Sequence, residues 1–159
     1  MGKNGEGWVI LQIICLGLVA FVPSFNDFQL TSLVQLGFLS LGTILAVLAT
    51  VFMIWSFWEL GANLRAPPDP KQDNRLITTG PYSWVRHPIY FSLILLSLAW
   101  QIVRVNPLGL VWIGLLFLVL YFKSQREEKR LHQIHPEYAQ YQQNVPRFFP
   151  RLGGKQGTY

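Results

Sequence analysis

Long apolar runs separated by polar stretches dominate the pattern of this 159-residue chain. The first run extends from Trp8 to Val22, and the second extends from Leu33 to Trp58 with 26 residues and no charge. At about 1.5 Å of rise per residue, a helix of the second length crosses a hydrocarbon core of about 30 Å. A secretory signal peptide would resemble the first run, but no small-residue cleavage pattern follows it. The pattern therefore predicts two membrane-spanning helices.

Two shorter apolar runs follow, Ile89 to Val103 and Leu108 to Phe122, with 15 residues each. They are separated by Asn106-Pro107, a turn signal. Helices of this length extend about 22 Å, which is less than a full crossing. They are expected either as two spans, with Arg104 reaching the interface, or as a helical hairpin that turns back inside the membrane. Both arrangements return the chain to the side from which it entered.

Two polar segments flank the shorter runs. Residues 59–87 form a long connection, which in a compact protein is usually functional or disordered, and their Trp, Tyr and Ile content argues against disorder. Residues 123–143 carry an amphipathic stripe that Pro136 interrupts, so two short helices are expected there. The stripe consists of Leu131, Ile134, Tyr138 and Tyr141.

These elements predict one all-α integral membrane domain over residues 1–159, with about four transmembrane helices. The last two form a short helical hairpin, and a C-terminal amphipathic helical segment follows. The domain divides into two N-terminal spans (1–58), a cytoplasmic connection (59–87), the hairpin (88–122) and C-terminal cytoplasmic helices (123–150).

Composition and charge support this topology and orient it. Hydrophobic residues make up 51% of the chain and charged residues 13%, and the net charge is +5. With four crossings, twelve of the thirteen Lys and Arg residues lie on one side and only Arg104 lies on the other. Because cytoplasmic loops carry the excess of basic residues, both termini are predicted to be cytoplasmic. The sequence contains no nucleic-acid-reading motif, so anionic lipid headgroups are the expected partner of the positive charge.

Several chemistries find no support in the sequence. Cys15 is the single cysteine, which excludes a disulfide within the chain. His132 and His135 lack a matching set of ligands, so no metal is expected. No phosphate-binding loop, dinucleotide fingerprint, zinc motif or serine nucleophile elbow is present.

The segment Arg86-His87-Pro88-Ile89-Tyr90 is the first candidate for chemistry. Pro88 suits the first turn of a helix, where its missing N–H group would have no partner. The free N–H groups and the positive end of the dipole would then face the polar connection and attract a carboxylate or phosphate. A basic flank with a histidine that only caps the helix explains the same residues, and both explanations are open.

The segment Arg126-Glu127-Glu128-Lys129-Arg130 is the second candidate. Lys123 and Glu127 are four residues apart and Glu127 and Arg130 are three apart, which is typical of a solvated ion-pair face on a helix. Two adjacent carboxylates just beyond an apolar helix could also pair with an ammonium group or with ribose hydroxyls.

Gly80-Pro81-Tyr82 and Trp84 place aromatic side chains at a turn in the cytoplasmic connection. Aromatic faces can stabilise a soft cation such as a sulfonium ion. At this depth, however, Tyr and Trp more commonly form the aromatic belt of the membrane interface.

Together the segments resemble the isoprenylcysteine carboxyl methyltransferase family and its phospholipid methyltransferase relatives. The resemblance covers about residues 60 to 150 and rests on several blocks in the family's order. The blocks are Gly80-Pro81-Tyr82-Ser83-Trp84-Val85-Arg86-His87-Pro88-Ile89-Tyr90, Glu127-Glu128, Tyr138-Ala139-Gln140-Tyr141 and Val145-Pro146-Arg147.

The resemblance implies a membrane methyltransferase that uses S-adenosyl-L-methionine, releases S-adenosyl-L-homocysteine and methylates a lipid or lipidated acceptor at the cytoplasmic interface. Arg86, His87 and Glu128 are then the expected catalytic residues, and Lys123 is the expected substrate contact, because the family has a basic residue at about this position. The methyl donor's pocket is expected to consist of Asn74, Arg75, Leu76, Ile77, Gly80, Tyr82, His87, Pro88, Ile89, Tyr90, Glu127 and Glu128.

A carboxylate acceptor needs no general base, whereas an amine or a phenol does, and His87 or Glu128 could serve. Two other functions are compatible with the sequence. Membrane sterol reductases, which use NADPH, share a related C-terminal architecture, and a non-catalytic four-helix membrane scaffold could keep the motif as a structural cap.

Overall fold

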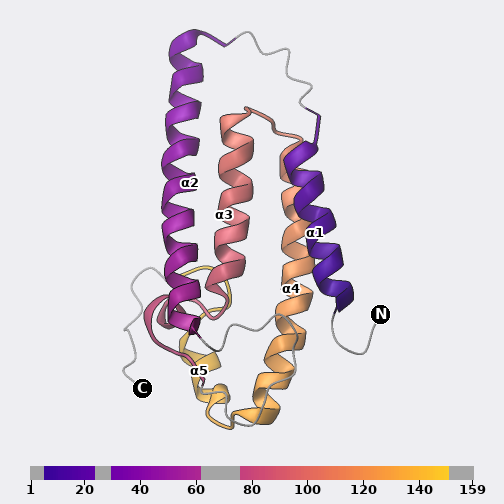
Figure 1. The fold of residues 1–159 in the computed structure, drawn as a ribbon, viewed down its shortest axis with the longest axis vertical. Helices are drawn as coiled ribbons and strands as arrows, with labels where there is room; N and C mark the ends of the chain where they lie inside the picture. The colour runs from indigo at the N-terminus through magenta and orange to yellow at the C-terminus, as the bar shows by residue number, and fades with distance from the viewer. Residues whose placement is uncertain (1–5, 24–29, 62–75, 151–159) are drawn as a thin grey trace.

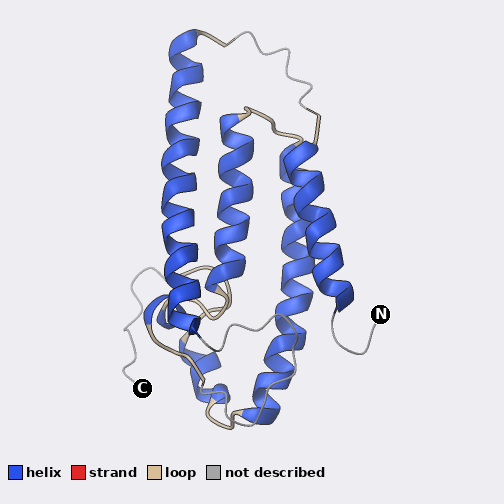
Figure 2. Ribbon diagram, viewed as in Figure 1, coloured by secondary structure: helices blue, strands red, loops and turns tan. Residues whose placement is uncertain are grey.

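The computed structural model describes residues 6–23, 30–61 and 76–150, and the regular elements in these ranges are all helical (Figure 2). This confirms the all-α prediction for the part of the chain described. The elements are α1 (Glu6–Phe21), α2 (Ser32–Leu60), the short 3-10 helix η2 (Gly80–Ser83), α3 (Pro88–Val103), α4 (Gly109–Ile134) and α5 (Tyr138–Asn144).

The four long helices run along a common axis (Figure 1). Helix α2 packs beside α3 in the opposite direction, and α1 packs against α4. By length and composition, α2 and α4 are able to cross a membrane, whereas α1 and α3 have 16 residues each. Two of the four predicted crossings therefore correspond to helices of sufficient length, and the other two stay predictions.

Small residues form the contact surface of α2 toward α3. Gly42, Ala49 and Ser56 are the buried residues of α2, and they are spaced seven apart. A Cβ atom on Gly42 would lie 2.5 Å from Cγ2 of Val103 and 2.9 Å from the carbonyl oxygen of Ala99. The two backbones thus approach closely, as small residues allow between helices in membranes.

The opposite surface of α2 is apolar and exposed. Val47, Leu48, Val51 and Ile54 each expose more than half of their surface, and Trp58 at the end of the helix is 83% exposed. A continuous apolar surface of this kind is unsuited to water, and a lipid environment covers it without penalty. This agrees with the membrane protein that the apolar runs predict.

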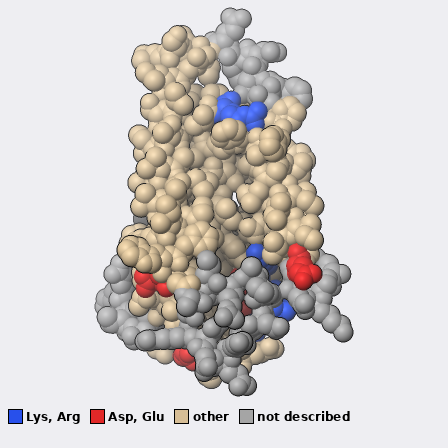
Figure 3. All heavy atoms as spheres, viewed as in Figure 1, with Lys and Arg blue, Asp and Glu red and all other residues tan. Residues whose placement is uncertain are grey.

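Charged side chains gather at one end of the bundle. In Figure 3 the acidic and basic residues lie mainly in the lower half of the bundle, and the apolar stretch above them carries none up to the upper end. One basic patch lies at the upper end beside the α3–α4 connection. Among the basic residues that the structure describes, Arg104 lies at the upper end and the polar part of α4 carries Lys123, Arg126, Lys129 and Arg130.

Arg104 connects the end of α3 to the end of α1 at the upper end of the bundle. Its guanidinium donates to the carbonyl oxygens of Ala20 and Val22, which belong to the last turn of α1 and the residue after it. Gln101 donates to Val19 O at 2.7 Å. A cation near a helix C-terminus is favourable because the carbonyls and the dipole there are negative. Arg104 therefore holds the end of α1 against the α3–α4 connection.

Two expectations about the C-terminal half are wrong. Helix α4 has 26 residues, so the second arm of the predicted hairpin is not short, and the polar residues 123–134 continue it instead of starting a separate helix. No helix breaker lies between Phe122 and Ile134, so backbone hydrogen bonding continues into the polar part. Only the second of the two short helices exists, as α5, after the break at Pro136.

Candidate functional site

A buried carboxylate organises the lower end of the bundle. The Glu128 side chain, on the polar part of α4, is only 4% exposed. Its Oε1 atom accepts from Nε of Arg86 at 3.1 Å and from Nε of Arg147 at 3.0 Å, and its Oε2 accepts from Nη2 of Arg147 at 2.6 Å. His87 Nε2 lies 3.1 Å from the same Oε1. Glu128, Arg86, Arg147 and His87 are called the Glu128 cluster below.

Two guanidinium groups compensate the charge that Glu128 brings into this buried place. Such pairs persist when every remaining donor and acceptor is also satisfied. Arg86 has further partners of this kind, because its Nη1 donates to the carbonyl oxygens of Gln142, at 3.0 Å, and of Val145. The hydrogen bond to Glu128 raises the pKa of Arg147, with burial acting in the opposite direction. The cluster is therefore a set of fixed charges that joins α4 to the segments before α3 and after α5.

The backbone strengthens this connection. Arg86 N–H donates to Pro146 O at 2.9 Å, and His87 N–H donates to Arg147 O at 3.1 Å. The residues before α3 thus lie along the Val145-Pro146-Arg147 block, although about sixty residues separate the two in the sequence. The sequence marked this block as part of the resemblance but assigned no role to Arg147, whose importance depends on this long-range contact.

The side chain of Glu127 faces a different environment from that of Glu128. It is 35% exposed, and its Oε1 atom accepts a hydrogen bond of 2.6 Å from the hydroxyl of Tyr90. His87 Nδ1 lies 3.7 Å from the other oxygen, and the rings of His87 and Tyr90 are stacked with centroids 5.3 Å apart. Glu127, Tyr90 and His87 are called the Glu127 cluster below. This cluster keeps part of a carboxylate accessible.

His87 joins the two clusters. One ring nitrogen faces each glutamate, so the imidazole lies between Glu127 and Glu128. Phe148 packs near the same ring, with centroids 5.9 Å apart, and is 4% exposed. The sequence did not single out Phe148. Phe148 belongs to the hydrophobic core of the bundle, so it forms the apolar side of the site.

Helix α3 begins at Pro88, which confirms the predicted helix start. His87 is the N-cap residue, and its side chain makes no capping hydrogen bond. The early N–H groups of a helix have no partner within the helix, so this terminus offers donors and a positive dipole end to the neighbouring Glu127 cluster. Ile89, in the first turn, is partly exposed.

The η2 turn brings Tyr82 to the same region. Burial raises the pKa of the Tyr82 phenol, and the negative charges of Glu127 and Glu59 raise it further, so the phenol is neutral. Its carbonyl oxygen accepts a hydrogen bond of 2.6 Å from Tyr141. Gly80 has φ +56°, and a Cβ there would lie 2.9 Å from the carboxyl carbon of Glu59. This conformation and this space both favour glycine.

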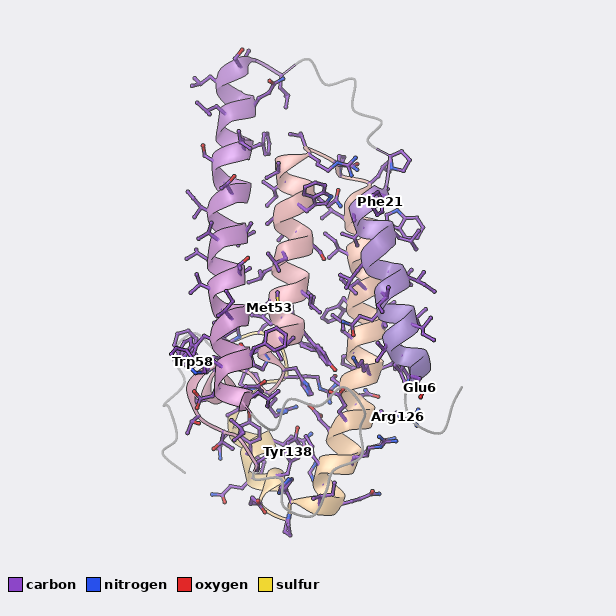
Figure 4. The ribbon with its side chains drawn as sticks, in the orientation of Figure 1. Glu6, Phe21, Met53, Trp58, Arg126 and Tyr138 are labelled. Carbon is purple, nitrogen blue, oxygen red and sulfur yellow. The ribbon has the colours of Figure 1, made fainter. Side chains whose placement is uncertain are left out.

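Two of the remaining predicted donor-pocket residues, Leu76 and Ile77, lie within the described part of the chain. Leu76 packs against a buried group of Tyr138, Tyr141 and Val145. Figure 4 shows Tyr138 among the side chains gathered at this lower end, with Arg126 on α4 away from them. Ile77 is partly exposed. Asn74 and Arg75 lie outside the described residues.

Lys123 lies at the edge of the Glu127 cluster. Its ammonium group is 5.1 Å from the centre of the Tyr90 ring, which is cation–π distance. It donates a hydrogen bond of 2.8 Å to Oε1 of Gln12 on α1. Helix α1 therefore contributes to the site, a role that the sequence did not predict. Within the described residues, no three His, Cys, Asp or Glu side chains are placed to hold a metal ion.

Comparison with known proteins identifies the family. The model of the phospholipid methyltransferase family matches residues 38–138. The cobalt-zinc-cadmium resistance protein CzcN of Cupriavidus metallidurans is 33% identical over 115 residues, which cover 72% of this chain and 50% of the relative. The protein-S-isoprenylcysteine O-methyltransferase of Schizosaccharomyces pombe is 36% identical over 145 residues, covering 88% of this chain and 58% of the relative.

A solved structure shows the same fold. The eukaryotic intramembrane Ras methyltransferase ICMT superposes with a TM-score of 0.62 at 21% identity, and the match covers 97% of this chain and 55% of that one. The chain thus spans about half the length of the curated relatives it matches. The family match extends from α2 to the start of α5 and includes both glutamates and the start of α3. The chain belongs to the phospholipid methyltransferase family, within which it is similar to the isoprenylcysteine methyltransferases.

Proposed function

We propose that the chain is an S-adenosylmethionine-dependent methyltransferase that acts on a lipid or lipidated acceptor at the cytoplasmic membrane interface. The observation that carries the proposal is the Glu127 cluster. An accessible carboxylate, two stacked rings and an uncapped helix start lie together at the polar end of a bundle with an apolar exterior. Several of the proteins that this chain is similar to are methyltransferases, which supports the same activity.

The residues of this region fit the methyl donor in kind. Glu127 offers a carboxylate to the donor's ammonium group or ribose hydroxyls, and the N–H groups at the start of α3 suit its carboxylate. Tyr82 and Tyr90 are neutral aromatic groups beside this position, and aromatic faces favour a sulfonium ion. When bound, S-adenosylmethionine would supply an electrophilic methyl group.

The Glu128 cluster adjoins this site, because His87 belongs to both clusters. Both oxygens of Glu128 accept hydrogen bonds from guanidinium groups, so the carboxylate is poorly suited to accept a proton from an acceptor. Arg86 is 7% exposed and engaged in the same way. We therefore assign Glu128 and Arg86 to positioning His87 and the start of α3. His87 remains the candidate base if the acceptor is an amine or a phenol.

The proposed topology has four crossings, with both termini and the site on the cytoplasmic side. The separation of basic residues supports this orientation. A site at the interface allows a water-soluble donor to arrive from the cytosol and a lipid acceptor to arrive from the bilayer. Holding the two together without water is most of what such a transfer needs from a protein.

Titration of the purified protein with S-adenosylhomocysteine tests the proposal, with NADPH as the comparison ligand. We expect S-adenosylhomocysteine to bind and NADPH not to bind. His87→Ala should abolish the binding, because it removes a ring from the Glu127 cluster, whereas His135→Ala should leave it unchanged. NADPH binding alone would favour a reductase, and binding of neither ligand would favour a non-catalytic scaffold.

A further inference from the structure

A cavity lies at the upper end of the bundle, opposite the candidate site. Helix α2 extends beyond the end of α3 there (Figure 1), and a cavity of about 490 Å³ lies between the first turns of α2 and the end of α3. Its lining includes Ser32, Gln35, Leu36, Leu39, Val103 and Arg104. None of the described residues that line it is acidic, so this Arg104 cavity is suited to an anion.

Arg104 is held in place at the wall of the cavity. Its Nη1 donates to the carbonyl oxygens of Ala20 and Val22, and its Cζ atom lies 5.7 Å from the centre of the Trp100 ring. A side chain that is already ordered loses little conformational entropy when a ligand binds. The cavity therefore offers a fixed positive charge beside the hydroxyl of Ser32 and the amide of Gln35.

An apolar groove of about 450 Å³ continues from the cavity along α2 and α3. Val103 lines both the cavity and this α2–α3 groove. On α2 the lining residues recur every three or four positions, which places them on one face of the helix: Ser32, Leu36, Leu39, Thr43, Ala46 and Thr50. The Thr50 hydroxyl donates to Ala46 O at 2.8 Å, so this polar group is satisfied within α2. The cavity and the groove thus form one continuous surface that is polar at one end and apolar along its length.

We propose that this surface binds an anionic phospholipid, with the phosphate beside Arg104 and one acyl chain along the α2–α3 groove. An inorganic anion would occupy the cavity and leave the groove uncovered. A hydrocarbon chain alone would cover the groove and leave Arg104 without an anion. The site lies at the opposite end of the bundle from the Glu127 cluster, so it is separate from the proposed donor and acceptor positions and does not depend on the proposed function.

The charge of the cavity distinguishes between lipid headgroups. Phosphatidylglycerol carries a phosphate and no cation, and its phosphate gains a charge-assisted hydrogen bond from Arg104. Phosphatidylcholine carries the same phosphate together with a quaternary ammonium group. That group finds no carboxylate among the described lining residues, and Arg104 repels it. Phosphatidylglycerol is therefore the expected occupant.

Two photoreactive lipids test the proposal. Both carry a diazirine in the same acyl chain, one with a phosphatidylglycerol head and the other with a phosphatidylcholine head. The protein in phosphatidylcholine nanodiscs is irradiated with each probe at equal concentration, and labelled peptides are quantified by mass spectrometry. We expect phosphatidylglycerol to label residues 96–103, which form the α3 side of the groove, about tenfold more strongly, the value of one charge-assisted hydrogen bond.

Variants then separate the headgroup from the chain. Arg104→Gln should reduce the labelling by phosphatidylglycerol to the level of phosphatidylcholine. Gln35→Glu adds a negative charge to the cavity and should act in the same direction, whereas Gln35→Lys should strengthen the preference for phosphatidylglycerol. Ala46→Phe fills the groove and should reduce labelling of residues 96–103 by both probes. Leu48→Phe, on the exposed surface of α2, is the matched control and should leave this labelling unchanged.

Each outcome decides one part of the proposal. Equal labelling by the two probes in the unmodified protein would overturn the assignment of an anionic headgroup. A preference for phosphatidylglycerol that persists in Arg104→Gln would overturn the role of Arg104. Equal labelling in Ala46→Phe and Leu48→Phe would overturn the position of the acyl chain. If Arg104→Gln does not fold, because Arg104 also holds α1, the opposite shifts of Gln35→Glu and Gln35→Lys decide in its place, and the absence of both shifts would contradict the proposal.

Discussion

The two faces of the polar part of α4 differ more than their adjacent glutamates suggest. Consecutive helical residues point about 100° apart, because a turn contains 3.6 residues. Glu128 points into the protein, where two arginines surround it, and Glu127 points toward Tyr90 with a third of its side chain exposed. The comparison suggests a division of roles, in which one carboxylate holds the structure together and the other is free to meet a ligand.

Removal of Glu128 tests the structural half of this division and should have the largest effect. Glu128→Ala leaves Arg86 and Arg147 close together without their shared counter-ion. Breaking a buried ion pair in this way costs about 3 to 5 kcal/mol of stability. Unfolding followed by denaturant titration in mild detergent measures the loss, and Glu137→Ala, at an exposed position, is the control. Equal stability of the two variants would show that the Glu128 cluster does not hold the fold.

Replacement of Arg147 should have a smaller effect of the same kind. Arg147→Met retains an apolar stem against Tyr121 but removes two of the donors to Glu128, and Arg86 remains. A buried hydrogen bond to a charged group contributes about 1.5 to 3 kcal/mol, so a loss of about 2 kcal/mol is expected. The same denaturant titration measures it. A loss as large as that of Glu128→Ala would mean that Arg86 contributes little.

The comparison of Glu127 with Glu128 also concerns stability at alkaline pH, because each glutamate lies near a buried tyrosine. The Tyr82 and Tyr138 pKa values are raised, mainly by burial, and Glu127 raises the first while Glu128 raises the second. A raised folded pKa contributes stability that is complete below the unfolded value near 10.0 and is lost as pH rises toward the folded pKa.

Stability should therefore fall above pH 10, by about 1.4 kcal/mol per pH unit for each buried phenol. Melting temperatures measured between pH 8 and about pH 11 report this slope. Tyr82→Phe should make the fall in stability with pH less steep, because the contribution of one buried phenol is removed. An unchanged slope would show that Tyr82 ionises in the folded protein as readily as in the unfolded chain.

The helices and the start of α3 could be predicted from the sequence, because local patterns determine them. The apolar runs gave α1 and α2 to within a few residues, and Pro88 marked the first residue of α3. The continuation of α4 through its polar half was not predicted. A change from apolar to polar residues marks the edge of the membrane, but it does not end a helix.

The different surroundings of Glu127 and Glu128 could not be predicted, because they depend on distant residues. Arg147 reaches Glu128 from the segment after α5, and the direction in which each glutamate points follows from the packing of α4. Gln12 was missed for a similar reason, since its partner Lys123 lies 111 residues away. Local patterns marked the segments of the candidate site, and long-range contacts determined the surroundings of each of its residues.

The most direct test of the central claim compares Glu127→Gln with the unmodified protein in two measurements, melting temperature and S-adenosylhomocysteine affinity by calorimetry. Glu137→Gln, a change of the same kind at an exposed residue, is the control. Glu127→Gln should weaken binding at least about tenfold, the effect of losing one charge-assisted contact, with an unchanged melting temperature. Unchanged affinity for S-adenosylhomocysteine in Glu127→Gln would contradict the assignment of Glu127 as the carboxylate that meets the donor.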